Sequence, residues 1–277
     1  MNITDLSFMR GFIRMATDGY NRGWHERNGG NLSYRLKKSE VEDFRGFVGR
    51  DALGTPSWTS LGAGIPELAE EVFLVTGSGK FFRNIELCPP ENIGLCELDE
   101  KGGNYRILWG LENGGKPTSE FLSHLMNHAA KIKAKGDNYR VIYHCHPSNI
   151  IAMSFLLPLC EKTFTRELWQ MITECAIVFP DGVGVMPWEV CGGREIAEKS
   201  AVLMADYDVL LWANHGIFCA GEDFDLTFGL ADTVEKAAEI WLKIAGANKK
   251  KLQTITPENL RELAKAFSVK LPERFFE

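Results

Sequence analysis

Short apolar runs of strand length alternate with helical segments along most of this chain. Runs typical of strands cover residues 32–36, 72–75, 105–111, 140–145, 176–179 and 208–213. Helical periodicity covers residues 5–22, 117–135, 163–174, 193–206, 222–246 and 257–267. Because the two kinds of element are interleaved, the chain is predicted to form an α/β fold in which helices sandwich a sheet.

Residues 38–68 interrupt this alternation. The stretch has five glycines, two prolines and little periodicity, so an irregular excursion with a small hairpin is predicted here. The sequence has no internal repeat, low-complexity tract or Pro/Ser-rich linker. We therefore expect residues 1–277 to form a single domain with an irregular insert at about 38–68.

The charge balance limits the kinds of partner. With 31 basic and 37 acidic residues the chain carries a net charge of −6, which argues against binding to nucleic acid. An anionic substrate must then be held by a local site and not by the field of the whole protein.

Two further features of the composition indicate a cytoplasmic location. No apolar stretch is long enough to span a membrane, and the N-terminal residues lack the pattern of a secretion signal. The seven cysteines include no C-x-x-C pair, which is typical of reduced thiols in a cytoplasmic protein.

The strand-type run that begins at Val141 ends in two histidines separated by one residue. Side chains two residues apart point to the same face of a strand, so His144 and His146 are expected to lie close together. His215 follows another buried run directly before a glycine, where functional groups often lie. Three imidazoles with one open position are the pattern of a catalytic zinc site. From the residues alone, a hydrogen-bonded histidine pair in the core explains the first two equally well.

His124 and His128 form a second pair, four residues apart on one face of an expected helix. This spacing also suits a metal, but the pair lacks the glutamate that follows the first histidine in zinc proteases. Phe121 and Leu125 lie along nearly the same stripe, so a role at the boundary of the core is the preferred interpretation. His25 lies in an N-terminal loop without an identifiable partner.

Glu120 lies in the first turn of the helix that is expected to open at Pro117. Thr118 or Ser119 is the expected N-cap of that helix. The helix dipole stabilises a carboxylate at this position, so the residue pattern alone favours a structural role over that of a general base.

Two glycine-rich loops adjoin expected strands. Asn28-Gly29-Gly30-Asn31 precedes one strand, and Thr76-Gly77-Ser78-Gly79 follows another. Such loops expose backbone amides that can hold phosphate oxygens, although an ordinary tight turn is the more common explanation of each loop. The second loop is not a Walker A motif, because Phe81 stands where Ser or Thr should follow Lys80.

Together, these motifs resemble those of the class II aldolase/adducin-like family over nearly the whole chain. The matching segments are GWHERNGGNL from Gly23, VTGSGKFFRN from Val75, PTSE from Pro117, HCH from His144, TEC from Thr173, VFPDGVG from Val178 and HG from His215. The resemblance implies a three-layer α/β/α sandwich with a mixed, largely antiparallel central sheet. The chain shows no departure from the family pattern at its histidine and glutamate positions.

The resemblance also implies roles for individual residues. His144, His146 and His215 would bind one Zn²⁺ per subunit, and Glu120 would be the catalytic carboxylate. A second catalytic group, Glu174, would reach a neighbour's site in a homotetramer whose active sites lie near subunit interfaces. The implied phosphate- and substrate-binding residues are Asn28, Gly30, Asn31, Ser78, Gly79, Thr118 and Ser119.

The reaction that the resemblance implies is the reversible cleavage of L-rhamnulose 1-phosphate to dihydroxyacetone phosphate and L-lactaldehyde, in rhamnose catabolism. Zinc would polarise the ketose and stabilise the enediolate, and Glu120 would shuttle the proton at C3. The alternatives are an aldolase for L-fuculose 1-phosphate, or a 4-epimerase or dehydratase with the same zinc site. A non-catalytic adducin-like binding module is a further alternative, but it has no physical need for the three histidines together with Glu120.

Overall fold

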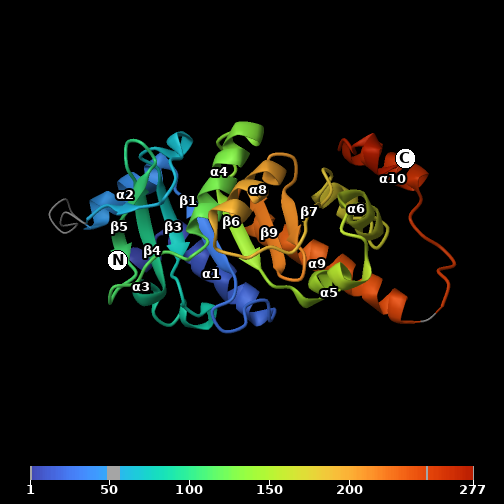
Figure 1. The fold of residues 1–277 in the computed structure, drawn as a ribbon, viewed down its shortest axis with the longest axis horizontal. Helices are drawn as coiled ribbons and strands as arrows, with labels where there is room; N and C mark the ends of the chain where they lie inside the picture. Colours follow the sequence, from blue (N-terminus) through green and yellow to red (C-terminus); the bar gives the residue numbers. More distant parts are fainter. Residues whose placement is uncertain (1, 49–56, 248, 277) are drawn as a thin grey trace.

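The computed structural model describes residues 2–48, 57–247 and 249–276 (Figure 1). Over these ranges, strands of the chain form one nine-stranded sheet. The strands are β1 (Asn31–Arg35), β2 (Thr59–Ser60), β3 (Val72–Thr76), β4 (Ile93–Leu98), β5 (Asn104–Gly110), β6 (Val141–Cys145), β7 (Gly184–Met186), β8 (Val209–Trp212) and β9 (Gly216–Gly221). Their order across the sheet is β2-β5-β4-β3-β1-β6-β9-β8-β7. Neighbouring strands pair antiparallel except for β7 and β8, so the predicted mixed, largely antiparallel sheet is confirmed.

Helices cover both faces of this sheet. The α-helices are α1 (Ser7–Asn21), α2 (Lys38–Val48), α3 (Pro89–Asn92), α4 (Phe121–Lys135), α5 (Ser148–Leu156), α6 (Glu161–Trp169), α7 (Cys175–Val178), α8 (Arg194–Met204), α9 (Phe224–Gly246) and α10 (Pro257–Phe267). Short 3-10 turns are η1 (Ile3–Asp5), η2 (Pro66–Leu68), η3 (Phe82–Asn84) and η4 (Glu273–Phe275). Helices α4 and α8 pack together on one face, and α1, α5 and α9 pack on the other (Figure 1). The predicted three-layer sandwich is therefore confirmed.

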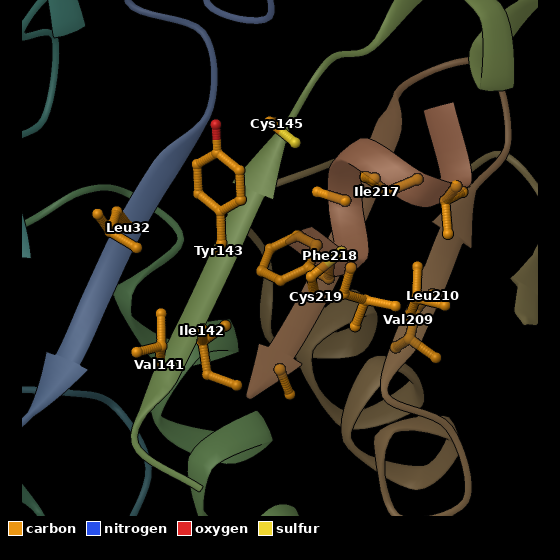
Figure 2. Packing of buried hydrophobic residues seen from close by; sticks show 14 of the residues in the cluster. Leu32, Val141, Ile142, Tyr143, Cys145, Val209, Leu210, Ile217, Phe218 and Cys219 are labelled. Carbon is orange, nitrogen blue, oxygen red and sulfur yellow. The ribbon is translucent and has the colours of Figure 1, made fainter. Parts of the chain in front are cut away.

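Side chains alternate between the two faces of each strand, which explains how one sheet packs against helices on both sides. In β3, Val72 and Leu74 belong to the larger apolar cluster, whereas Phe73 and Val75 belong to a second cluster that includes Phe121 of α4. The central strands are buried on both faces and lose nearly all contact with water. Figure 2 shows the packing of side chains from β1, β6, β8 and β9 within the larger cluster.

Two sequence expectations about local structure are wrong. Residues 176–179 were expected to form a strand, but Cys175–Val178 forms the helical turn α7, in which Ala176 faces the core and Val178 is exposed. An apolar run this short does not distinguish a strand from a buried helical turn.

The irregular excursion predicted for residues 38–68 begins with helix α2, and among the described residues strand β2 pairs with β5 and does not form a hairpin within this stretch. Residues 49–56 of that stretch lie outside the described residues.

Helix α4 begins later than its sequence suggests. Glu120, and neither Thr118 nor Ser119, occupies the N-cap position, with the helix itself starting at Phe121. The Thr118 hydroxyl accepts a hydrogen bond from the Glu120 backbone N–H at 3.3 Å. The carboxylate of Glu120 therefore projects from the junction between the loop and the helix, where its side chain can face the sheet edge.

Candidate active site

One edge of the sheet brings together most of the residues that the sequence singled out. Because the central strands are antiparallel, the starts of β1 and β9 and the ends of β3, β6 and β8 meet at the same edge. The register pairs Asn31 of β1 with His144 of β6. The loop before β1, the loop after β3 and the turn between β8 and β9 therefore surround the end of β6.

His144 and His146 point their Nε2 atoms at each other. The two atoms lie 3.2 Å apart. His144 Nδ1 donates to the carbonyl oxygen of Ile217 at 2.9 Å, and His146 Nδ1 donates to the carboxylate of Glu26 at 2.7 Å. A carbonyl or carboxylate oxygen can only accept, so each Nδ1 carries a proton, and in a neutral ring the lone pair is then on Nε2. Two lone pairs so close together repel unless a cation lies between them.

His215 completes the group from the turn between β8 and β9. Its ring centroid lies 4.9 Å from that of His144 and 5.0 Å from that of His146. Asn214 adopts a left-handed conformation with φ 61°, which turns the chain back sharply just before His215. At Gly216 a Cβ atom would lie 2.8 Å from His146 Cδ2 and would also meet the Cys145 carbonyl oxygen. Glycine at this position lets β9 approach the two histidines.

The three histidines fit a divalent metal. One nitrogen of each ring can be chosen so that all three lie within 4.8 Å of one another. A tetrahedral zinc site with bonds of about 2.1 Å needs nitrogens roughly 3.4 Å apart, close to the spacing of the first pair. Hydrogen bonds from both Nδ1 atoms orient the rings, as partners of metal-bound histidines do.

Burial favours the uncharged forms of His144 and His215. It lowers the pKa of His144 well below its usual value, and the charges of His146 and His215 lower it further. Burial, assisted by the charge of His146, lowers the pKa of His215 to about 4. Both rings are therefore neutral near pH 7, the state in which an imidazole can ligate a metal.

Glu120 lies beside this group, buried against the start of β1. Its Oε2 is 3.6 Å from His144 Nε2 and accepts a hydrogen bond from Asn31 Nδ2 at 2.6 Å. Burial raises the pKa of this carboxyl, and the hydrogen bond from Asn31 and the charge of His146 act in the opposite direction. A raised pKa suits a carboxyl that takes up and returns protons during a reaction.

A chain of buried hydrogen bonds fixes the Asn31 amide. Because Nδ2 donates to Glu120, the amide oxygen faces His124 Nε2, which donates to it. The Ser33 hydroxyl lies 2.7 Å from His124 Nδ1 and 2.9 Å from His128 Nε2. Burial lowers the pKa of His124 to about 3, so its ring is neutral and Nδ1 accepts the Ser33 proton. His128 Nε2 then donates to the Ser33 oxygen, and every proton in the chain has a defined position.

The spacing of the two polar residues on strand β1 matches the spacing of the two histidines on helix α4, and this match brings the groups together. Asn31 and Ser33 are two residues apart on β1, roughly 6.6 Å, and His124 and His128 are four residues apart on α4, roughly 6 Å. The expected core-boundary role for these two histidines is wrong, since both are fully buried within the polar chain. His128 Nδ1 is also buried and has no hydrogen-bond partner among the described residues.

The two glycine-rich loops lie at the same edge. Ser78 N–H donates to the Lys116 carbonyl and Thr118 N–H donates to the Thr76 carbonyl, so the segments at 76–79 and 116–119 run side by side. Ser78, Gly79, Ser119 and Asn28 are exposed there, and Thr118 is buried. Asn31 differs from the other residues expected to bind phosphate, because both ends of its amide are already hydrogen-bonded within the protein.

His25 has partners that the sequence did not reveal. Its Nε2 lies 2.7 Å from the Tyr143 hydroxyl, its Nδ1 lies 3.0 Å from the Gly29 carbonyl oxygen, and its ring stacks on Phe82 at 3.5 Å. Gly30, with φ 72°, leaves no room for a Cβ beside the His25 ring. His25 therefore holds the first glycine-rich loop against β6, on the face opposite His144.

Glu174 lies apart from the histidines within this chain. It is exposed and precedes α7, which packs against α9 and α10. No hydrogen bond or ion pair found in the described residues joins Glu174 to Glu120 or to the histidine group.

A family model described as Class II Aldolase and Adducin N-terminal domain matches residues 11–242. The chain belongs to this family.

Among the described residues, none of the helices combines the length and the apolar character that a membrane span needs.

Curated relatives of this class II aldolase family member align along nearly their whole length. A rhamnulose-1-phosphate aldolase of Yersinia pestis (strain Pestoides F) is 47% identical over 262 residues, which cover 95% of this chain and 94% of the relative. One of the same name from Klebsiella pneumoniae (strain 342) is 44% identical over 267 residues, covering 96% and 95%.

Solved structures of the family share the fold. A sugar-phosphate aldolase from Thermotoga maritima matches with a TM-score of 0.72 and 28% identity, covering 87% of this chain and 96% of that chain. The L-fuculose-1-phosphate aldolase from Thermus thermophilus matches with a TM-score of 0.56 and 20% identity, covering 88% and 97%. This last likeness concerns the fold alone.

Proposed function

We propose that this protein is a zinc-dependent aldolase that reversibly cleaves L-rhamnulose 1-phosphate to dihydroxyacetone phosphate and L-lactaldehyde. The observation that carries the proposal is the convergence of three histidines beside the buried carboxylate of Glu120. The substrate is proposed because curated relatives at 44% and 47% identity over nearly the whole chain carry the name rhamnulose-1-phosphate aldolase.

His144, His146 and His215 are the proposed metal ligands. Three imidazole nitrogens are the donors that Zn²⁺ takes in catalytic sites, which keep a further position open for substrate. When bound, the ion would supply a Lewis acid that stabilises the negative charge left on the dihydroxyacetone phosphate fragment by cleavage of the C3–C4 bond. Glu26 and the Ile217 carbonyl hold the ring protons on Nδ1 and so keep both Nε2 atoms free.

Glu120 is the proposed catalytic carboxylate. In the cleavage direction it returns a proton to C3 of the dihydroxyacetone phosphate fragment, and in the synthetic direction it removes that proton. Burial raises its pKa, which supports the protonated form, and the hydrogen bond from Asn31 orients the carboxyl. No Schiff base is needed in this route, since the charge of the intermediate is met electrostatically.

The phosphate of the substrate is proposed to bind at the two glycine-rich loops. The exposed side-chain hydroxyl groups of Ser78 and Ser119 and the exposed Gly79 support this role, and Asn28, Gly30 and Thr118 are further proposed members of the site. For Asn31 we propose a part in this site through Glu120, because both ends of its amide are already hydrogen-bonded.

We further propose a single class II aldolase domain that assembles as a cytoplasmic homotetramer. The exposure of Glu174, away from the histidines of its own chain, supports a role for this residue in a neighbouring subunit's site. The proposal predicts that Glu174→Gln lowers turnover without changing the metal content of the protein.

The decisive experiment measures release of dihydroxyacetone phosphate from L-rhamnulose 1-phosphate, beside L-fuculose 1-phosphate as the competing substrate. We expect cleavage of the rhamnulose substrate, loss of cleavage in the presence of a chelator, and its return when Zn²⁺ is added back. Preferential cleavage of L-fuculose 1-phosphate would replace the substrate assignment. Failure of the zinc-loaded protein to cleave either compound would instead favour an epimerase or dehydratase.

A further inference from the structure

Cys191 lies beside the proposed metal ligands. Its Sγ, one ring nitrogen of His215 and one carboxylate oxygen of Glu120 all lie within 4.8 Å of one another. The residue belongs to the segment between β7 and α8, a part of the chain for which the sequence patterns indicated no function. Its side chain is exposed, whereas Cys145, between the two histidines of β6, is fully buried.

The geometry around His144 points to a cation independently of this thiol. His144 is buried, and its unprotonated Nε2 faces the Nε2 of His146 at 3.2 Å and the carboxylate of Glu120 at 3.6 Å. An ion held by the histidines would therefore also lie near His215 and Glu120, the two residues that neighbour Cys191. The thiol is therefore placed near such an ion, which takes a further ligand beyond three histidines.

The position of Cys191 is set from both sides. Glu189, two residues earlier, forms an ion pair with Lys199 of α8. Gly192, with φ 78°, lies against Ser119, since a Cβ added there would be 3.9 Å from the Ser119 side chain. The second contact places the segment next to the loop that precedes α4.

We propose that Cys191 supplies a thiolate ligand to the metal of the substrate-free enzyme, an inference that rests on the proposed zinc site. Zinc accepts thiolate and imidazole ligands in the same site. On ligation the thiol proton passes to solvent and a sulfur–metal bond forms. When an oxygen of the substrate replaces the sulfur, that bond breaks and the thiolate takes up a proton from solvent.

Cobalt substitution tests this assignment directly. The apoprotein, prepared with a chelator, is titrated with Co²⁺, and absorption is recorded for the wild type, Cys191→Ser and Cys160→Ser. Cys160 is the matched control, because it is also an exposed cysteine but precedes α6 at a distance from the site. A thiolate bound to cobalt gives an intense charge-transfer absorption in the near ultraviolet, whereas the visible ligand-field bands report bound cobalt with or without sulfur.

We expect the charge-transfer band in the wild type and in Cys160→Ser, and its loss in Cys191→Ser with the visible bands retained. Addition of dihydroxyacetone phosphate is expected to weaken the band. Visible bands without the charge-transfer band in the wild type would overturn the role of Cys191 and leave the histidine site standing. A charge-transfer band that persists in Cys191→Ser would also overturn it. Absence of both signals in the wild type would overturn the metal site itself, and the proposal with it.

Discussion

Asn31 donates a hydrogen bond from its side-chain amide to the carboxylate of Glu120, and the two atoms lie 2.6 Å apart inside the protein. The same amide accepts from His124, so it cannot rotate without losing two buried hydrogen bonds. The carboxyl that we assign to proton transfer is therefore oriented by an uncharged group, which aims it without neutralising it. A lysine or arginine at position 31 would instead lower the pKa of Glu120 and make it a poorer proton donor.

The first prediction concerns Glu120→Gln. The amide oxygen can still accept from Asn31, but the side chain can no longer carry a proton. We expect turnover to fall by about 10²–10⁴-fold, the scale of lost acid–base catalysis, with the metal content unchanged. Cleavage assays and metal analysis measure the two quantities. Glu112→Gln, at an exposed carboxylate, is the control, and near-normal turnover of Glu120→Gln would remove this residue from the mechanism.

The second prediction concerns Ser33→Ala. The substitution leaves His124 Nδ1 without a donor and His128 Nε2 without an acceptor, and both atoms are buried. We expect the free energy of unfolding to fall by about 2–4 kcal/mol, since each unsatisfied buried group costs about 1–3 kcal/mol. Chemical denaturation measures the free energy of unfolding, and Ser7→Ala, at an exposed position, is the control. Equal stability of the two variants would show that the buried chain does not depend on this hydroxyl.

The third prediction concerns Gly216→Ala. The added methyl group would meet the Cys145 carbonyl and would lie 2.8 Å from the His146 ring, so the β9 backbone or the His146 ring must shift. Because that shift disturbs the orientation of a metal ligand, we expect metal affinity to fall by about 10–100-fold. Competition with a chelator measures the affinity. Gly229→Ala in α9 is the control, because a Cβ there has open space, and an equal affinity of the two variants would contradict the expectation.

The fourth prediction is a loss of stability on acidification. Burial lowers the pKa of both His25 and His124 from 6.5 to about 3 in the folded protein. Their folded pKa lies below the unfolded one, so the unfolded chain binds more protons between these values, and stability falls as the pH decreases from about 6.5 toward 3. Each histidine contributes about 1.4 kcal/mol per pH unit within this window.

The variant that tests this pH dependence is His124→Gln. Its side chain does not titrate, so the slope of the unfolding free energy against pH, between pH 4 and 6, should decrease by about 1.4 kcal/mol per unit. Chemical denaturation of the apoprotein at several pH values gives the slope. An unchanged slope would mean that His124 is already protonated in the folded chain.

Much of the histidine group could be predicted from sequence because its geometry is local. Strand periodicity places His144 and His146 on one face, and the glycine after His215 marks a strand end. The distance between His215 and the other two is not local, and only the antiparallel pairing of β6 with β9 creates it. The role expected for Glu120 came from family resemblance, since its position in the sequence is also that of an ordinary helix start.

The buried chain through Ser33 was beyond sequence reasoning for a different reason. Ser33 is a single small polar residue in a short strand, and its partners lie on a helix far along the sequence. The one available signal was the pair His124 and His128 on an otherwise apolar helical stripe, where a polar pair must find partners. Cys191 gave no signal at all, because a loop has no periodicity from which to infer the direction of a side chain.

The hydrogen bond from His144 to the Ile217 carbonyl crosses from β6 to β9, and His215 directly precedes β9. An ion that binds all three histidines would therefore join two strands that are distant in sequence, and its binding free energy would add to the stability of their pairing. Scarcity of the metal would then have a second effect besides loss of activity. It would shorten the lifetime of the protein in the cell, because the strand pair that opens lies in the interior of the sheet, with further strands on both sides.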